Sequence, residues 1–146
     1  MPFCPESNLS GVGHYGVMKH TWYRRAYWTG EAFNDSAWQT ARAPFGTINN
    51  PRTPWNTPDI WLRWAFDWHG ASLKEAALVI FYDEDREVLV NGQKIWNRSG
   101  FATTCDIFTV TEALKMALKK GTNTLAVHTR QTGGGQCIDL ALLWEP

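Results

Sequence analysis

The chain has 146 residues, a formal net charge of +0 and nine tryptophans within an aromatic content of 14%. This length fits one domain of ordinary size, which can bury a core without metal or disulfide support. Balanced charge gives no basic field, so we expect neither nucleic acid nor a membrane surface as a partner. No apolar run approaches the roughly 20 residues of a membrane span, and the N-terminus lacks the basic and apolar regions of a signal peptide.

Residues 1–20 predict a loose lead-in with at most one edge strand, because glycines and prolines interrupt any periodicity, and His20 is expected to be solvated. A first strand is predicted over Thr21–Arg25. The turn that follows is Asn34-Asp35-Ser36, whose side chains can bond nearby backbone groups, with Phe33 and Trp38 pinning it to the core. Residues 21–146 are expected to form a single β-sandwich domain.

The segment Ile48–Pro58 contains three prolines, which forbid a central strand, and it is longer than an ordinary connection. We therefore expect a binding loop. Trp55 is the preferred ligand platform, because flat aromatic rings stack on the apolar faces of sugars. Asn56 and Asp59 are the polar groups closest to it. The alternative is that Trp55 folds back as a lid over the core.

The chain is organised around the stretch Asp59–Asn91, whose first predicted strand is Asp59–Trp68. Side chains alternate across a strand, so the apolar face that starts at Ile60 is built to be buried. The other face carries Trp61 beside Arg63, a pair that can equally hold a sugar ring or lie flat under a covering loop. Six further tryptophans are assigned to packing: Trp22, Trp28, Trp38, Trp64, Trp68 and Trp144.

Short strands rich in β-branched and aromatic residues continue to the end of the chain. They are predicted over Leu78–Asp85, Glu87–Asn91, Gln93–Asn97, parts of Phe101–Val110, Leu125–Arg130 and Cys137–Trp144. Asn91-Gly92 predicts a two-residue hairpin turn with positive φ. A helix is predicted over Thr111–Lys119, with Thr111 as its cap and Gly121 as its stop. Many strands and one small helix indicate an antiparallel β-sandwich.

Further candidates for ligand binding, one aromatic and the others polar, lie in two places. Trp96 is the second aromatic candidate, with Arg98 beside it. His128 and Arg130 share one strand face, and Gln131 follows them into a glycine loop where backbone can approach a ligand closely. The alternative for His128 is a hydrogen bond across the sandwich.

The acidic corner Asp83-Glu84-Asp85 has three interpretations: a solvated turn, a sugar or calcium site through Asp83 and Asp85, or pairing with Arg86 or Arg130. No cofactor is required by the sequence. Three scattered cysteines do not indicate a zinc site or a disulfide framework, and Cys105 and Cys137 are interpreted as buried free thiols.

The order of these pieces resembles the sugar-binding domain of family-two glycoside hydrolases, a galactose-binding-like jelly-roll sandwich. The segments that carry the resemblance are Asp35-Ser36-Ala37-Trp38, Trp61–Phe66, Val88-Leu89-Val90-Asn91-Gly92, Asp106-Ile107-Phe108 and Gly121–Val127. In that family the catalytic acid and nucleophile lie in a separate barrel domain. The resemblance therefore implies an all-β, antiparallel jelly-roll β-sandwich with one short helix and no catalytic residues of its own.

The resemblance further implies a carbohydrate-binding module, joined to a neighbouring catalytic domain in a larger secreted or periplasmic glycan-degrading protein. We expect the module to be a monomer. The alternative function is a structural domain that orients its neighbour and binds no glycan. A third interpretation, a small lyase or hydrolase, requires the Asp83–Asp85 corner and His128 to converge in one cleft. No motif in the sequence nominates a nucleophile with its base.

Overall fold

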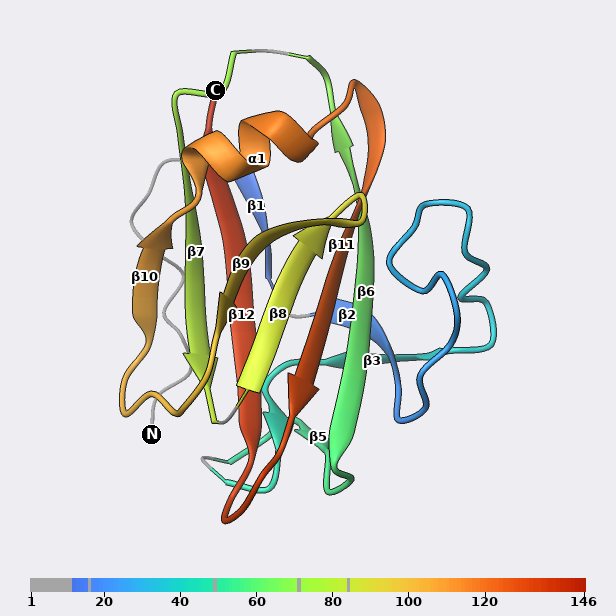
Figure 1. The fold of residues 1–146 in the computed structure, drawn as a ribbon, viewed down its shortest axis with the longest axis vertical. Helices are drawn as coiled ribbons and strands as arrows, with labels where there is room; N and C mark the ends of the chain where they lie inside the picture. The colour runs from blue at the N-terminus through green and yellow to red at the C-terminus, as the bar shows by residue number, and fades with distance from the viewer. Residues whose placement is uncertain (1–11, 16, 49, 71, 84) are drawn as a thin grey trace.

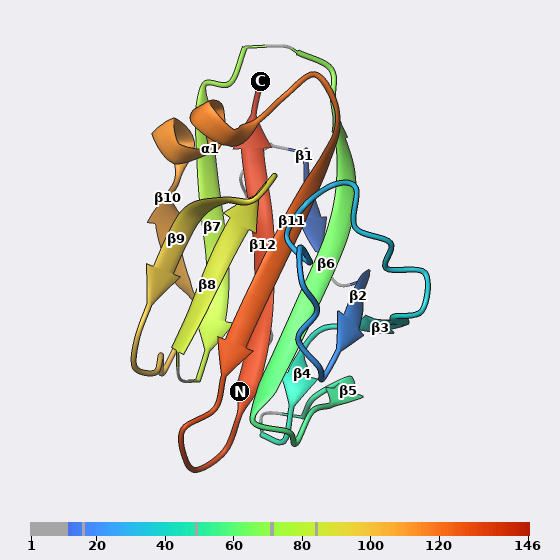
Figure 2. The same ribbon diagram turned by 45° about the vertical axis from the view of Figure 1, so that its right-hand side comes forward.

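The computed structural model describes residues 12–15, 17–48, 50–70, 72–83 and 85–146; within this part, side chains are described from Met18 onward. Two β-sheets face each other and enclose one apolar core (Figures 1 and 2). The first sheet holds β10 (Asp106–Thr109), β7 (Glu75–Tyr82), β12 (Cys137–Glu145), β4 (Phe45–Gly46) and β5 (Thr53–Pro54) in that order, with β1 (Val12–Tyr15) also paired to β12. The predicted all-β sandwich is confirmed.

The second sheet carries the surface features discussed below. Its strand order is β3 (Gln39–Arg42), β2 (Val17–Thr21), β6 (Asp59–Trp68), β11 (Gly121–Arg130), β8 (Asp85–Val90) and β9 (Gln93–Arg98). β6 has the predicted bounds and pairs with β11 along its whole length. On its other side it pairs with β2 over Trp61–Arg63. β2, with the edge strand β3 beyond it, therefore pairs with only part of β6.

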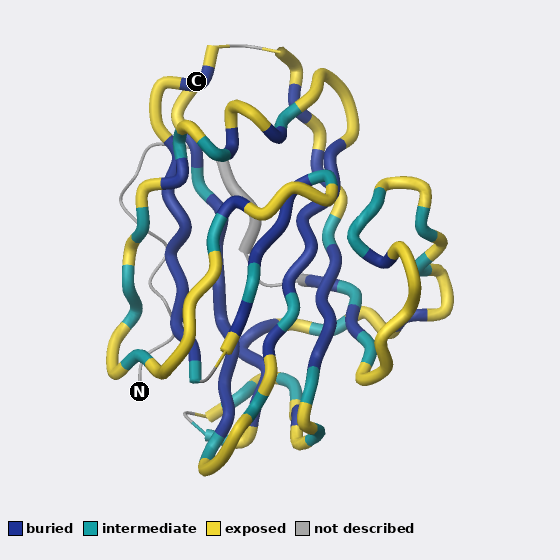
Figure 3. Tube along the Cα trace, viewed as in Figure 1, coloured by how far each residue is buried: buried dark blue, intermediate teal, exposed yellow. Residues whose placement is uncertain are grey.

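Strand alternation produces the core. From Ile60, every second residue of β6 points between the sheets, where it meets inward residues of β7, β11 and β12 such as Ile80 and Leu140. Figure 3 shows this as buried segments along the central strands and exposed loops at the two ends. Burial of these apolar side chains stabilises the folded state by about 1.5–3 kcal/mol each and is the main source of stability.

The N-terminal prediction needs correction. Two strands, β1 and β2, lie within residues 12–21, and the strand predicted over Thr21–Arg25 ends at Thr21. Residues 22–38 then leave the sheet as a long connection, here called the 22–38 loop, which lies beside β6 (Figure 1). His20 is 4% exposed, so its predicted solvation is wrong. The strand that includes it pairs on both sides, with β3 and β6, which draws it into the sheet.

Turn chemistry behaves as the sequence predicts at the hairpin between β8 and β9. Asn91 and Gly92 both have positive φ, 50° and 79°. The Asn91 amide also donates to the Ala117 carbonyl and to Asn123 Oδ1, at 2.9 and 2.7 Å. These bonds tie the hairpin to the end of α1 (Thr111–Ala117), which covers one end of the sandwich with Leu114 buried beneath it.

Two smaller predictions are wrong. Thr111 does not cap α1, because its hydroxyl instead exchanges hydrogen bonds with the backbone of Ala76 in β7. Cys105 is disulfide-bonded rather than a free thiol. Cys137 is a buried free thiol as predicted, and burial, with help from the negative charges of Asp139 and Asp83, raises its pKa to about 12. The described part of the chain contains no helical segment with the length and hydropathy needed to cross a bilayer.

Candidate functional site

Trp55 does not form an exposed platform, so this prediction is wrong. Its side chain is 0% exposed and belongs to the main core. The indole Nε1 donates to the Asp59 carbonyl oxygen at 3.1 Å, which satisfies its polar group inside the protein. The ring therefore lies folded back onto the core, as the alternative interpretation expected.

His128 and Asp59 are brought together on the outer face of the second sheet. His128 Nε2 lies 2.7 Å from Asp59 Oδ1, and Nδ1 lies 3.7 Å from Glu87 Oε1. The imidazole is also stacked on Trp61, with ring centroids 4.8 Å apart and planes inclined by 5°. Trp28 from the 22–38 loop meets it edge-on at 6.5 Å. The imidazole is thus held by partners within this face, not by a bond across the sandwich.

The other predicted polar residues at this end have different surroundings. Arg130 stands opposite Asp59 in the β6–β11 register and is exposed, and Asn56 is exposed as well. Gln131 turns inward, where its amide nitrogen lies 2.7–2.9 Å from the carbonyl oxygens of Gly133, Gly134 and Gly135. Gln131 therefore shapes the glycine loop, whereas ligand contacts by Asn56 and Arg130 stay predictions.

Trp96 and Arg98 lie on β9, at the far edge of the same sheet. The Trp96 ring is half-buried between Tyr82 and Phe108, with centroid distances of 5.8 and 4.9 Å. The Arg98 guanidinium lies 5.0 Å from the centre of the Phe108 ring. Most of the Trp96 surface is used for packing, so only part of the ring is available to a ligand.

The acidic corner offers little for a metal ion. Asp85 Oδ1 accepts a hydrogen bond from the Gly100 amide, and Asp83 pairs with Phe101 through an isolated bridge. Glu84 falls outside the described residues. Within the described ranges, no three His, Cys, Asp or Glu side chains are grouped as metal ligands. Calcium binding by Asp83 and Asp85 therefore stays a prediction without structural support.

The outer face of β6 is covered by the 22–38 loop, which decides between the two interpretations of Trp61 and Arg63. Both side chains are buried, at 7% and 4% exposure. Arg63 donates to the carbonyl oxygens of Trp28 and Gly30 and, through Nε, to Asp35 Oδ2 at 2.9 Å. The arginine thereby anchors the loop on the sheet.

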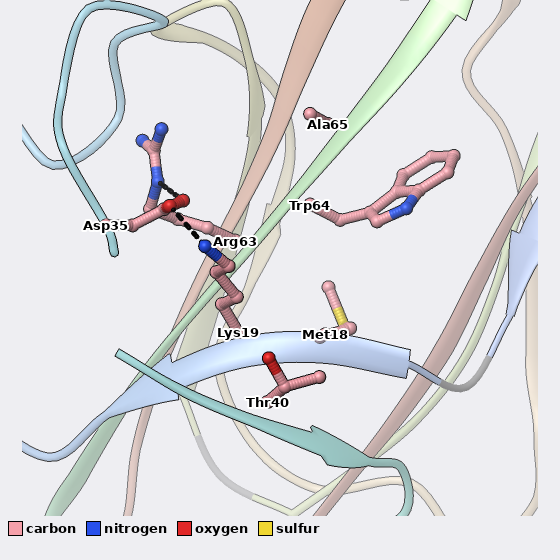
Figure 4. A pocket seen from close by; sticks show the side chains of 7 residues that line it. All are labelled: Met18, Lys19, Asp35, Thr40, Arg63, Trp64 and Ala65. Atoms are coloured by element: carbon pink, nitrogen blue, oxygen red, sulfur yellow. Dashed lines mark hydrogen bonds and ion pairs between the residues drawn. The ribbon is translucent and has the colours of Figure 1, made fainter. Parts of the chain in front are cut away.

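Beside this anchor lies an open pocket of about 380 Å³, the larger of two pockets described here, and we call it the charged pocket (Figure 4). Its lining residues are Met18, Lys19, Asp35, Thr40, Arg63, Trp64 and Ala65. Lys19, Asp35 and Arg63 lie on the outer side of β6, whereas the Trp64 ring projects from the opposite side of the strand, away from them and against the core (Figure 4). The volume falls within the 300–1,000 Å³ usual for small-molecule sites, which pair apolar walls with a few placed polar groups.

The ionic side of the charged pocket is ordered by hydrogen bonds. Lys19 Nζ donates to Asp35 Oδ1 at 3.0 Å, while Arg63 occupies Oδ2. Burial by itself raises the pKa of Asp35, but hydrogen bonds from Arg63 and Lys19 and their positive charges outweigh it and hold the pKa below the ordinary value. Asp35 is therefore a carboxylate at neutral pH, and the three groups carry one net positive charge.

A second pocket, of about 210 Å³, lies at the end of β2, and we call it the aromatic pocket. It is lined by His20, Thr21, Trp22, Tyr23, Ala37, Trp38 and Gln39. Trp22 and Tyr23 are 38% and 66% exposed, so the assignment of Trp22 to packing is wrong. The Trp22 ring leaves the sheet because β2 ends at Thr21.

The lining residues of both pockets were mostly missed from sequence. The sequence predicts Asp35 only as part of a turn. That turn is present, because the Ser36 amide donates to Asn34 Oδ1 at 3.0 Å and the Trp38 amide donates to the Asp35 carbonyl at 2.9 Å. Arg63 on the outward face of β6 was the available signal. Nothing in the local sequence connects it with Lys19, which reaches the same carboxylate from another strand.

Comparison with solved structures finds the same fold within larger glycoside hydrolases. A β-glucuronidase 2 from Bacteroides uniformis aligns with 92% of this chain at a TM-score of 0.68 and 16% identity. A glycosyl hydrolase family 2 member from Bacteroides cellulosilyticus aligns with 89% at 0.65 and 17% identity. A Faecalibacterium prausnitzii β-glucuronidase aligns with 97% at 0.58 and 13% identity. No protein-family model and no curated protein matches the sequence.

These similarities concern the fold. The predicted resemblance to a domain of family-two glycoside hydrolases is confirmed at that level, since 89% and 88% of the chain align with two structures described as members of that family. The chain spans only 18% of the length of the Bacteroides uniformis protein, 20% of the Bacteroides cellulosilyticus protein and 33% of the Faecalibacterium prausnitzii protein. A shared fold does not by itself carry a shared activity.

Proposed function

We propose that this chain is a non-catalytic carbohydrate-binding domain of a larger glycan-degrading protein. The observation that carries the proposal is the charged pocket, in which Lys19, Asp35 and Arg63 form a hydrogen-bonded ionic wall beside the exposed Ala65. The comparisons add support, because the aligned region covers 20% and 17% of two chains described as family-two glycoside hydrolases. A domain that makes up only a small part of such a chain leaves most of that chain for the catalytic domain, which is consistent with an accessory role.

The chemistry of the charged pocket suits sugar hydroxyl groups. A lysine ammonium has three donors, and the bond from Lys19 to Asp35 uses one of them. Each carboxylate oxygen of Asp35 accepts one protein hydrogen bond and retains a further lone pair for a hydroxyl donor. Apolar surface on this side of β6 comes from the exposed Ala65, because Met18 is 2% exposed and Trp64 is stacked on Phe66. Recognition would be shallow, so a modest affinity is expected.

The exposed Asn56 and Arg130, together with Asp59 and His128, form a second polar region to which the same proposal extends with less support, because His128 and Asp59 already bond each other. The parent protein would act outside the cytoplasm, as a secreted or periplasmic enzyme. The disulfide at Cys105 supports this location, since disulfides persist in oxidising compartments. We propose a monomeric domain whose partners are a glycan and the neighbouring catalytic domain.

Retention in native gels that contain soluble polysaccharides tests the proposal. The panel would include xylan, galactan, mixed-linkage β-glucan and polygalacturonate, with and without EDTA. The informative variant is Lys19→Met, which keeps the side-chain stem and leaves the Arg63–Asp35 bond in place. Lys115→Met is the matched control, because Lys115 makes a similar surface ion pair, with Glu112 on α1, at 43% exposure compared with 40% for Lys19.

We expect retention of the wild type on at least one polysaccharide and a loss of about tenfold in affinity for Lys19→Met, the value of one charge-assisted hydrogen bond. Lys115→Met should behave as wild type. Equal retention of both lysine variants would contradict the assignment to the charged pocket. Loss of retention in EDTA would support the predicted calcium site at Asp83 and Asp85.

The second candidate function is a structural domain that orients a catalytic neighbour. The observation that favours it is the burial of Trp55, whose indole N–H donates to the Asp59 carbonyl, together with the Gln131 amide nitrogen, which donates to carbonyl oxygens of the glycine loop. A folded wild type that is retained on no polysaccharide would select this function over glycan binding.

A further inference from the structure

The charged pocket and the aromatic pocket are built from the same three pieces of chain. In the β2–β3 register, Lys19 pairs with Thr40 and His20 pairs with Gln39. The first pair lines the charged pocket and the second lines the aromatic pocket. Neighbouring residues of a strand are about 3.3 Å apart along its axis. The two pockets therefore follow each other along one hairpin.

The third shared piece is the turn at the end of the 22–38 loop. Asp35 lines the charged pocket, and Trp38, whose amide donates to the Asp35 carbonyl at 2.9 Å, lines the aromatic pocket. Thr21 also lines the aromatic pocket, and it projects from the same face of β2 as Lys19 because side chains alternate along a strand. Both pockets thus have a wall on the same face of the hairpin.

The chemistry of the aromatic pocket differs from that of its neighbour. Its lining contains Trp22, Tyr23 and Trp38 with the polar groups of Thr21 and Gln39, and no Asp, Glu, Lys or Arg. Burial lowers the pKa of His20, despite the opposing effect of a hydrogen bond that the ring donates to the Gln39 backbone, so its imidazole is neutral at pH 7. Its volume, about 210 Å³, is below the range for drug-sized ligands and suits one small ring.

We propose that the two pockets are consecutive subsites of one glycan-binding groove, so that the preferred ligand is an oligosaccharide of at least two sugar units. One unit is held by Lys19 and Asp35 in the charged pocket. The next unit, uncharged, stacks on Trp22 and Tyr23 in the aromatic pocket. This inference rests on the proposed glycan binding. It adds that the bound glycan runs along β2 and β3 and that it has at least two sugar units.

Affinity as a function of ligand length tests the groove. The probes are the mono-, di-, tri- and tetrasaccharides prepared from whichever panel polysaccharide retains the wild type, measured by titration calorimetry. The variants are Trp22→Ala, Tyr23→Ala and Lys19→Met. The matched control is Tyr27→Ala, because Tyr27 belongs to the same 22–38 loop, is 90% exposed and lines neither pocket. Circular dichroism confirms that each variant is folded.

For the wild type we expect affinity to rise about tenfold between the monosaccharide and the disaccharide or trisaccharide, the effect of one added aromatic stack. Trp22→Ala should remove most of that rise and leave monosaccharide affinity unchanged, whereas Lys19→Met should weaken every length. Tyr27→Ala should match the wild type.

The failures are distinguishable. An unchanged rise in Trp22→Ala and Tyr23→Ala, with Lys19→Met still weakened, overturns the groove and leaves the charged pocket as the site. A wild type whose affinity does not depend on length also overturns the groove. Absence of wild-type retention on every panel polysaccharide overturns glycan binding itself, and the groove with it.

Discussion

Two arginines of the second sheet are equally buried and yet are held in opposite ways. Arg63 on β6 and Arg86 on β8 are each 4% exposed. Arg63 meets the carboxylate of Asp35, the carbonyl oxygens of Trp28 and Gly30, and the ring of Phe33 at 5.1 Å. It connects the 22–38 loop to the sheet.

Arg86 has mainly aromatic neighbours. Its guanidinium lies 3.2 Å from the centre of the Tyr82 ring and 5.3 Å from that of Trp96, and Nη1 donates to the Gly100 carbonyl at 2.8 Å. Nε and Nη2 have no hydrogen-bond partner among the described residues. Burial lowers its pKa to about 10. Equal burial therefore does not mean equal contribution to stability, because the partners decide whether the cost of desolvation is offset.

The largest effect is expected for Arg63→Met. The substitution keeps an apolar stem but leaves the loop carbonyl oxygens and Asp35 without their main donor, so the free energy of unfolding should fall by about 3–5 kcal/mol. Urea unfolding measures this change. A loss below about 1 kcal/mol would show that the 22–38 loop is held by its aromatic contacts alone.

Asp35→Asn should have the next largest effect, about 2 kcal/mol at pH 7, because charge-assisted bonds to Arg63 and Lys19 become neutral ones. The pKa of Asp35 is lowered in the folded state, so its stabilisation is present above the ordinary value of 3.8 and is lost as pH falls through the lower folded value. The stability difference between wild type and Asp35→Asn should therefore shrink below pH 4. A difference that is constant with pH would contradict the assigned ionic role.

Arg86→Met should change stability by less than about 1 kcal/mol, and in the direction of stabilisation if it changes at all. The methionine side chain can pack against Tyr82 and Trp96, and the substitution removes two buried donors that lack partners. Urea unfolding beside Arg63→Met gives the direct comparison. A loss equal to that of Arg63→Met would mean that the aromatic rings stabilise the cation as well as the carboxylate does.

The smallest effect concerns His20, a buried ionisable group with no charged partner assigned. Its pKa is lowered from 6.5 chiefly by burial, so the unfolded chain binds a proton at a pH where the folded protein does not. Stability should therefore decrease as pH falls from 7.5 to 5.5, and His20→Gln should flatten this slope. Parallel slopes for the two proteins would show that the imidazole is protonated without cost.

The strand pattern was predictable because it depends on neighbours in sequence. The alternation from Ile60 to Trp68 predicts β6 with its observed bounds, and Asn91-Gly92 predicts the hairpin, since positive φ at two successive residues is a local steric property. The resemblance to family-two glycoside hydrolases rests on the order of such local pieces, and the confirmed fold follows from that order.

The site was less predictable, because exposure is decided by contacts between distant residues. Trp55 lies in a proline-rich segment of the kind that forms binding loops, but the Asp59 carbonyl accepts its indole proton and the core accepts its ring. Trp22 belongs to the segment predicted as the first strand and is exposed because β2 ends one residue earlier. Local sequence does not distinguish these two tryptophans.

By itself, then, the sequence determined an all-β sandwich with one small helix, a buried face on β6 and an outward Trp61–Arg63 pair whose role was open. Tertiary structure alone decided that this pair lies under the 22–38 loop and that Lys19, Asp35 and Arg63 meet beside Trp64. The physical reason is that alternation and turn chemistry act over a few residues. A pocket depends on which strands pair and where a loop docks, and here it joins residues from β2, β3, β6 and the loop between β2 and β3.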